Sequence, residues 1–182
     1  MAASPERTHF IAMAGYNRWM NQKVYAAAAK LPIGQFEAPA GAFFGSLAGT
    51  LNHLVLADTI WLQRFVAHPI PYRALDVVRA LPEPTALASV TAPPFEHLLG
   101  QRQLLDAVIE DWMGELQDEH LGATVQYKRL NGECYAKRLG SVLMHFFNHQ
   151  THHRGQASTL LFQAGLDIGA TDLLVLIPEA AL

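Results

Sequence analysis

Two histidines four positions apart are the clearest chemical signal in this sequence, His149 and His153 in the run Asn-His-Gln-Thr-His-His-Arg-Gly-Gln of residues 148–156. Side chains at positions i and i+4 of a helix project from the same face. Two imidazoles placed in this way can bind one metal ion. An isolated match of this kind is more often a surface pair or a hydrogen-bonded core pair. Here His145 and His152 enlarge the cluster, which favours metal binding.

A third ligand must come from another segment, and His53 has the best position for it. His53 falls well inside a second predicted helix, while the remaining histidines fall near helix ends or in loops: His9, His68, His97 and His120. Taken alone, His53 is better interpreted as a core histidine with a hydrogen-bond partner. Together with His149 and His153 it forms a three-histidine set that leaves coordination positions open, as a catalytic metal requires.

Four long helical segments are expected to position these side chains. The first begins near Ser4 and Pro5, a cap followed by a first-turn proline, and runs until Pro32. The others cover about 46–67 with Ser46 as cap, about 95–116, and about 141–164 before Gly165. Residues 68–94 are rich in proline, so we expect mostly irregular chain that serves as a crossover or a lid over the substrate.

A small hairpin is expected between the third and fourth helices. The pair Asn131-Gly132 is a strong turn signal, and strand-like residues 123–130 and 133–138 flank it. No internal repeat or second domain boundary is visible. The predicted fold is therefore a single all-α domain over residues 1–182, a four-helix bundle with a crossover connection and one β-hairpin. Metal sites in such bundles are commonly built from side chains on facing helices.

Composition narrows the function classes further. The 182 residues are 51% hydrophobic and only 16% charged, which suggests a buried partner surface besides the core, and hence a homodimer. A net charge of -3 with no lysine or arginine cluster disfavours nucleic-acid binding. The single Cys134, the absence of a signal-peptide core and the lack of a long apolar stretch favour a cytoplasmic protein with no membrane span.

Three segments of the chain together resemble the DinB/YfiT-like superfamily of bacterial metalloproteins. They are Tyr-Asn-Arg-Trp-Met-Asn at 16–21, Leu-Asn-His-Leu at 51–54 followed by Asp58 and Trp61, and the histidine-rich run at 148–156. The similarity spans about residues 8 to 165. It implies a four-helix bundle with a crossover, frequently a homodimer, that holds one divalent ion by the residues His53, His149 and His153. Nickel, zinc and iron all suit imidazole ligands.

The resemblance also implies a range of activities. The superfamily includes bacillithiol and mycothiol S-transferases and mycothiol-dependent maleylpyruvate isomerase. A metal-dependent enzyme on a small-molecule substrate is therefore expected, of thiol S-transferase or hydrolase type, with a low-molecular-weight thiol as a second cofactor in the first case. The alternatives are a non-catalytic metal-binding stress-response protein and an interaction module whose histidines are only packed.

Four further residues are candidates for the site. Asp58 and Asn52 are candidate catalytic residues, as proton-transfer groups or as groups that orient the ligands. Gln156 and His152 are expected near the pocket rim and are candidate cofactor-binding residues. For Asp58, a buried ion pair with a cation such as Arg18 or Arg154 is at least as good an interpretation.

Other chemical templates fit the sequence less well. The metalloprotease helix has a general-base glutamate where this chain has Gln150, and the fourth helix has no acidic residue for a di-iron site. Cys134 has no obvious partner and is interpreted as an incidental thiol. One tryptophan on each of three helices is interpreted as part of the core: Trp19, Trp61 and Trp112.

Overall fold

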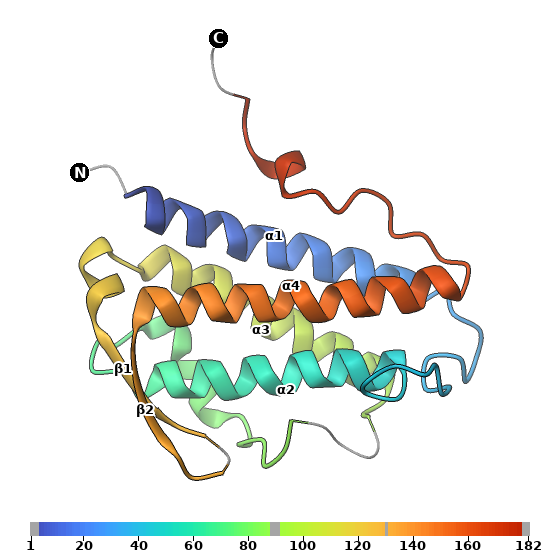
Figure 1. Cartoon of the computed structure of the whole chain (residues 1–182), viewed down its shortest axis with the longest axis horizontal. Coiled ribbons are helices and arrows are strands. Elements are labelled where there is room, and N and C mark those ends of the chain that lie inside the picture. Colours follow the sequence, from blue (N-terminus) through green and yellow to red (C-terminus); the bar gives the residue numbers. More distant parts are fainter. Residues whose placement is uncertain (1–3, 88–91, 130, 180–182) are drawn as a thin grey trace.

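Four α-helices lie side by side in the computed structural model, which describes residues 4–87, 92–129 and 131–179. They are α1 (Pro5–Ala28), α2 (Leu47–Val66), α3 (Phe95–Glu115) and α4 (Leu139–Gln163) (Figure 1). Among the described residues, the 3-10 helices η1 (Arg73–Ala80) and η2 (Asp118–Gly122) lie in the connections, and η3 (Leu173–Leu176) lies in the chain after α4. The predicted all-α bundle is confirmed, and each predicted helix end lies within about one turn of the observed end.

Serine caps fix the starts of the first two helices, as predicted. The Ser4 hydroxyl accepts a hydrogen bond from the Arg7 backbone N–H at 3.2 Å, and Pro5 takes the first helical position. The Ser46 hydroxyl accepts from the Gly49 N–H at 3.0 Å. Helix α4 starts two residues earlier than predicted, because strand β2 leads directly into it at Arg138.

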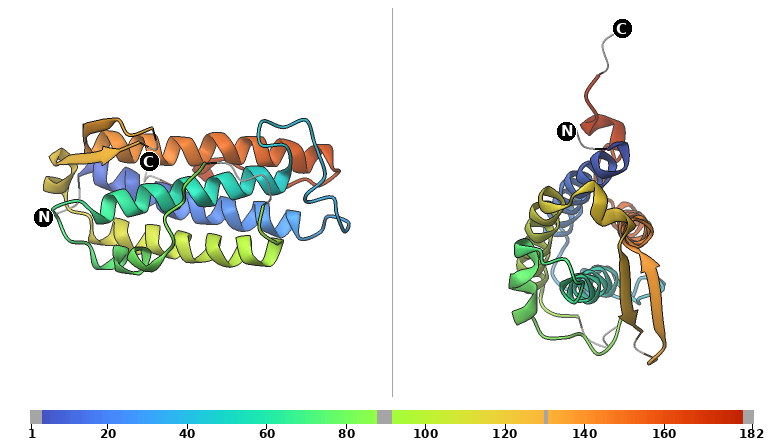
Figure 2. Two further views of the ribbon diagram at one scale, coloured as in Figure 1. Left: turned by 90° about the horizontal axis from the view of Figure 1, so that it is seen from below. Right: turned by 90° about the vertical axis from the view of Figure 1, so that its left-hand side faces the viewer.

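The crossover topology follows from how the helices pack. Both α1 and α2 pack against α3 and α4, so α1 and α2 lie diagonally opposite each other. The ribbon colours show α1 and α4 running in one direction and α2 and α3 in the other (Figures 1 and 2). The chain between α2 and α3 must therefore return along the whole bundle, as predicted for residues 68–94. Helix η1 lies in this connection against α2 and α3, and residues 88–91 lie outside the described residues.

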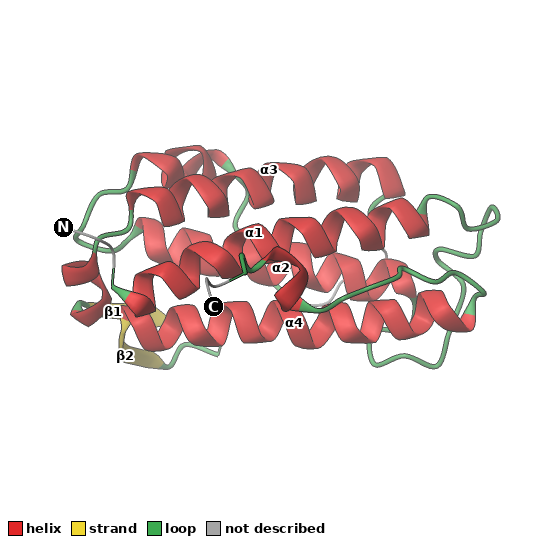
Figure 3. Ribbon diagram, turned by 90° about the horizontal axis from the view of Figure 1, so that it is seen from above, coloured by secondary structure: helices red, strands yellow, loops and turns green. Residues whose placement is uncertain are grey.

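The predicted hairpin is present and lies at one end of the bundle beside α2 and α4 (Figure 3). Strands β1 (Thr124–Lys128) and β2 (Cys134–Arg138) are antiparallel, with Val125 opposite Lys137. Val125 is fully buried, so its face of the hairpin is turned toward the helices. The turn contains Gly132 at φ 90°, a conformation that favours glycine, while residue 130 lies outside the described residues.

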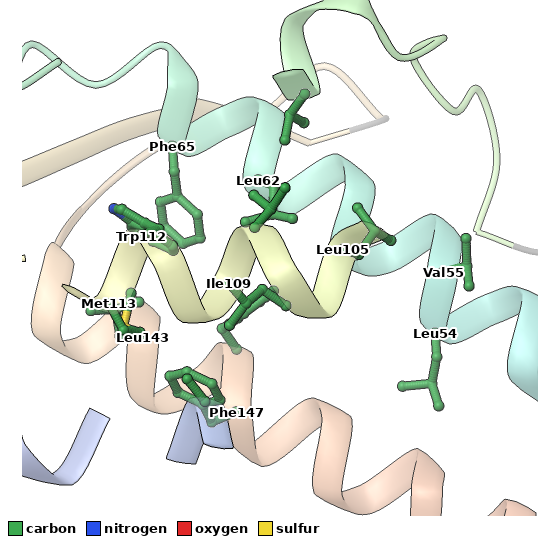
Figure 4. Packing of buried hydrophobic residues seen from close by; sticks show 14 of the residues in the cluster. Leu54, Val55, Leu62, Phe65, Leu105, Ile109, Trp112, Met113, Leu143 and Phe147 are labelled. Atoms are coloured by element: carbon green, nitrogen blue, oxygen red, sulfur yellow. The ribbon is translucent and has the colours of Figure 1, made fainter. Parts of the chain in front are cut away.

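The core lies between the helices and is made of large aliphatic and aromatic side chains (Figure 4). Trp112 on α3 is fully buried and packs against Phe65 of α2, with ring centroids 4.6 Å apart. The assignment of all three tryptophans to the core holds completely only for Trp112. Trp19 and Trp61 are partly exposed, and Trp61 lines a cavity.

The chain after α4 runs back along α1 and then leaves the bundle (Figure 1). The Tyr16 hydroxyl donates to the Thr171 carbonyl oxygen at 2.7 Å, which fixes the segment on α1. Beyond it, Leu174 and Val175 are 76% and 59% exposed. Among the described residues, no helix is long and apolar enough to cross a membrane.

Candidate metal centre

The structure brings the three predicted ligands together from two facing helices. His53 lies in the second turn of α2, and His149 and His153 lie one turn apart on α4. The Nε2 atom of His53 is 3.3 Å from Nε2 of His149 and 3.2 Å from Nε2 of His153. One ligand atom from each of the three side chains lies within 4.8 Å of the other two.

Hydrogen bonds orient two of these imidazoles. The Nδ1–H group of His53 donates to the Leu87 carbonyl oxygen at 2.7 Å. The Nδ1–H group of His153 donates to Oε1 of Gln156 at 2.8 Å. A neutral imidazole that donates through Nδ1 carries a lone pair on Nε2. The lone pairs of His53 and His153 therefore face each other with no proton between them, an arrangement that a cation would complete.

The surroundings keep the imidazoles neutral, which is the form that binds metal. Burial, together with the neighbouring imidazoles of His153 and His53, lowers the pKa of His149 to about 3. Burial is also the main cause that lowers the pKa values of His53 and His153.

The separations of the His53 nitrogen from its two partners fit a small divalent ion. Zinc–nitrogen bonds of about 2.0–2.1 Å at tetrahedral angles place two nitrogen ligands roughly 3.3–3.4 Å apart. The distances of 3.2 and 3.3 Å from His53 to its two partners are close to this value. Three protein ligands would leave at least one coordination position for a water molecule or a substrate.

An aromatic side chain that the sequence did not indicate forms one wall of the cluster. The Phe44 ring stacks on the His53 ring with centroids 4.0 Å apart, and its centroid lies 5.4 Å from that of His153. Gly49 permits this approach, since a Cβ atom there would collide with the Phe44 carbonyl oxygen. No ligand pattern includes an aromatic residue in the chain before the helix, so sequence reasoning had no signal for Phe44.

The candidate cofactor-binding residues lie beside the cluster on α4. Gln156 accepts from the candidate ligand His153, as described, and its Nε2 atom lies 3.3 Å from Nε2 of the exposed His152. Through this hydrogen bond Gln156 orients the imidazole of His153. Contact of either residue with a cofactor stays a prediction.

The candidate catalytic residues are buried in α2, with Asn52 3% exposed and Asp58 fully buried. Oδ2 of Asp58 accepts from Arg102 of α3 at 2.6 Å and from Nε2 of Gln150 at 2.9 Å. The expected ion pair exists, but its partner differs from the two that the sequence suggested. Arg18 pairs with Glu110, and Arg154 donates to Asn17.

Asp58 belongs to a set of buried polar side chains that we call the polar layer: Asn17, Asn21, Asp58, Arg102, Asp106, Gln150 and Arg154. Oδ1 of Asp106 accepts from both asparagines and lies 3.1 Å from the Arg102 guanidinium. Burial raises the pKa of Asp106 and lowers that of Arg154 to about 10. The layer contains two carboxylates and two guanidinium groups, so its formal charges balance.

A cavity of about 610 Å³ opens beside the histidine cluster, between α2, α4 and the hairpin. His149 forms part of its wall, together with Trp61, His145 and Tyr127. Partial desolvation lowers the pKa of His145, and the positive charges of Arg129 and Arg64 lower it further. The expected rim residues, Gln156 and His152, are absent from the described lining of this cavity.

Comparison with known proteins agrees with the predicted family and fold. The profile of the DinB family matches residues 5–180. Protein DinB of Bacillus subtilis (strain 168) is 27% identical over 158 residues, which cover 86% of this chain and 87% of that protein. No solved structure gives a significant match. Because the family profile spans nearly the whole chain, this protein belongs to the DinB family, and it carries a three-histidine cluster with the geometry of a metal site.

Proposed function

We propose that this chain binds one divalent metal ion through His53, His149 and His153, and is an enzyme of thiol-transferase or hydrolase type on small molecules. The observation that carries the proposal is the pair of facing Nε2 atoms, oriented by Leu87 and Gln156. Nickel, zinc and iron all suit three imidazole ligands.

The chemistry follows from neutral ligands and an open position. A divalent ion in this site supplies Lewis acidity, which makes a thiol or a water molecule a stronger nucleophile near neutral pH. The three imidazoles leave the charge of the ion uncompensated, since burial keeps each of them neutral. His149 places this charge at the wall of a cavity whose volume of about 610 Å³ suits a small molecule.

The nucleophile for thiol transfer comes from outside the chain. The single cysteine, Cys134, is exposed on β2 and is not part of the described cavity lining. A separate low-molecular-weight thiol would form the new sulfur–carbon bond as the bond from carbon to the leaving group breaks. The thiol proton departs with the leaving group, and in hydrolysis water takes the place of the thiol.

The test compares zinc-loaded protein with metal-free protein and with His53→Ala. Thiol transfer is followed with 1-chloro-2,4-dinitrobenzene and, in turn, glutathione, bacillithiol and mycothiol, and hydrolysis with p-nitrophenyl acetate. We expect turnover above the rate of free zinc only in the loaded wild-type protein. Bound zinc without such turnover in any assay would contradict the enzymatic proposal and support the alternative, a non-catalytic metal-binding stress-response protein.

We also propose that two copies of the chain form a homodimer. The support is a set of exposed apolar side chains: Leu174 and Val175 in the chain after α4, 76% and 59% exposed, and Phe162 in the last turn of α4, 71% exposed. Light scattering of the wild-type protein should give the mass of two chains. A Leu174→Asp/Val175→Asp variant should shift the mass toward one chain, and a monomeric wild-type protein would contradict the proposal.

A further inference from the structure

We propose that the cavity beside His149 binds a small organic carboxylate, with the acid group at Arg129 and Lys137 and an apolar body against Trp61. This inference rests on the proposed function, because it names the class of substrate that would reach the three-histidine site. Three observations support it: the positive charge of the cavity lining, the face that the hairpin turns toward the cavity, and the apolar wall next to the histidine cluster.

The lining is strongly positive. It contains Arg64, Arg129 and Lys137, and no aspartate or glutamate among the described residues. Within the described part of the chain, none of the three cations forms a salt bridge. Glu83 and Glu133 act on Arg64 and Arg129 through longer-range attraction, but neither carboxylate lines the cavity. A concave site with unpaired charge of one sign attracts small molecules of the opposite sign.

The alternation of side chains along the hairpin strands explains why Arg129 and Lys137 both reach the cavity. Val125, Tyr127 and Arg129 follow one another at every second position, and Lys137 lies directly opposite Val125. Val125 is fully buried against the bundle, so this face is turned toward the cavity, where Arg129 and Lys137 themselves are exposed. The pairing continues past the strand end, since the Arg129 N–H donates to the Glu133 carbonyl oxygen at 2.9 Å. Lys128 belongs to the opposite face and provides a matched control.

Arg64, Arg129 and Lys137 differ in the contacts that their charged groups already make within the protein. The Arg64 guanidinium lies 4.6 Å from the Trp61 ring centroid and donates to the Lys128 carbonyl oxygen at 3.0 Å. The Arg129 guanidinium has only the Tyr135 ring as a close partner among the described residues, at 4.4 Å. Arg129 and Lys137 therefore keep their donors available for a carboxylate, to which the planar guanidinium can donate two parallel hydrogen bonds.

The apolar part of the cavity lies between these cations and the histidine cluster. Ile60 and Trp61 come from α2, Val142 comes from α4, and the Trp61 ring is 5.0 Å from that of Tyr127. His149 belongs to the same lining. A molecule with its acid group on the hairpin therefore places its apolar body against Trp61 and its far end near the metal ligands.

The test uses metal-free protein, so that a carboxylate cannot bind to metal. Calorimetric titration compares 2-naphthoate with the neutral 2-naphthamide, which has nearly the same shape. We expect the anion to bind roughly tenfold more tightly, as a hydrogen-bonded charge would give. Arg129→Met and Lys137→Met should each reduce this preference several-fold, and the double variant should abolish it. Lys128→Met should leave it unchanged.

A second readout locates the probe. In a ¹⁵N spectrum, 2-naphthoate should shift the indole N–H signal of Trp61 and leave that of the buried Trp112 in place. Equal affinity for the two probes, no binding of 2-naphthoate, a preference that survives in the double variant, or an unmoved Trp61 signal would each overturn the inference. Since metal plays no part here, such a failure is distinct from a failure of the three-histidine site to bind zinc.

Discussion

The polar layer and the histidine cluster are two groups of polar side chains in the same apolar bundle, yet they differ in how their polar atoms are paired. In the polar layer, Asp58 and Asp106 meet the Arg102 guanidinium, and amide donors add further bonds. Its formal charges balance, although among the described residues Arg154 donates only to neutral groups and Asp58 Oδ1 has no protein partner. In the cluster, the Nε2 lone pairs of His53 and His153 face each other with no proton between them. Facing imidazole lone pairs, more than burial of polar groups, therefore mark the ligand site.

The largest effect is expected from breaking the polar layer. Arg102→Met should lower the free energy of unfolding by roughly 3–5 kcal/mol, because it leaves two buried carboxylates without their cation. Urea unfolding of metal-free protein measures this. The control is Arg18→Met, which removes an exposed pair with Glu110 and should cost less than about 1 kcal/mol. Similar losses in both variants would show that the layer is not a structural unit.

Binding of a metal ion to the histidine cluster should stabilise the folded protein. Free zinc at about 100 times its dissociation constant should add about 2.7 kcal/mol to the free energy of unfolding of the wild-type protein. His149→Ala should lose this gain, because the cluster then has two ligands. His152→Ala, an exposed neighbour on the same helix, should keep it. Unfolding curves with and without zinc would contradict the account if both variants behaved alike.

A smaller effect is expected from the residue that orients His153. Gln156→Leu removes the acceptor for the His153 Nδ1–H group and should weaken zinc binding by roughly 10- to 100-fold. Gln156→Glu keeps an acceptor oxygen and should bind zinc at least as well as the leucine variant does. Competition with a chelating dye gives the affinities. Unchanged binding in Gln156→Leu would mean that this hydrogen bond does not set the tautomer.

The smallest effect concerns the aromatic wall of the cluster. Phe44→Leu removes the ring that stacks on His53 and should lower the free energy of unfolding by about 0.5–1.5 kcal/mol. The matched control is the adjacent Phe43→Leu, since Phe43 is 87% exposed and should tolerate the change. Chemical unfolding compares the two. An equal loss in both would argue against a supporting role for the stacked ring.

Much of the scaffold could be predicted because its signals are local. Ser4 and Ser46 as caps, the proline-rich connection, and Asn131-Gly132 between strand-like segments each act over a few residues. His149 and His153 follow from helix periodicity alone. The prediction of His53 as the third ligand also needed its position inside a helix and the family resemblance. Spacing along the chain does not reveal which helices face each other.

The missed features depend on packing between distant segments. The partner of Asp58 is Arg102, because the crossover brings α3 beside α2, and no local pattern gives this helix order. The acceptor for His53 is a backbone carbonyl of Leu87, which leaves no trace in residue type. The cations of the cavity could have been found from the alternation of Val125, Tyr127 and Arg129, had the orientation of the hairpin been known.

The central claim is that the three imidazoles bind one metal ion and leave at least one of its coordination positions open. X-ray absorption at the zinc edge, on protein with one equivalent of zinc, tests it most directly. The account predicts three imidazole nitrogen atoms at about 2.0–2.1 Å and at least one further light-atom ligand. A spectrum with fewer than two imidazoles, or one that is unchanged in His53→Ala, would contradict it.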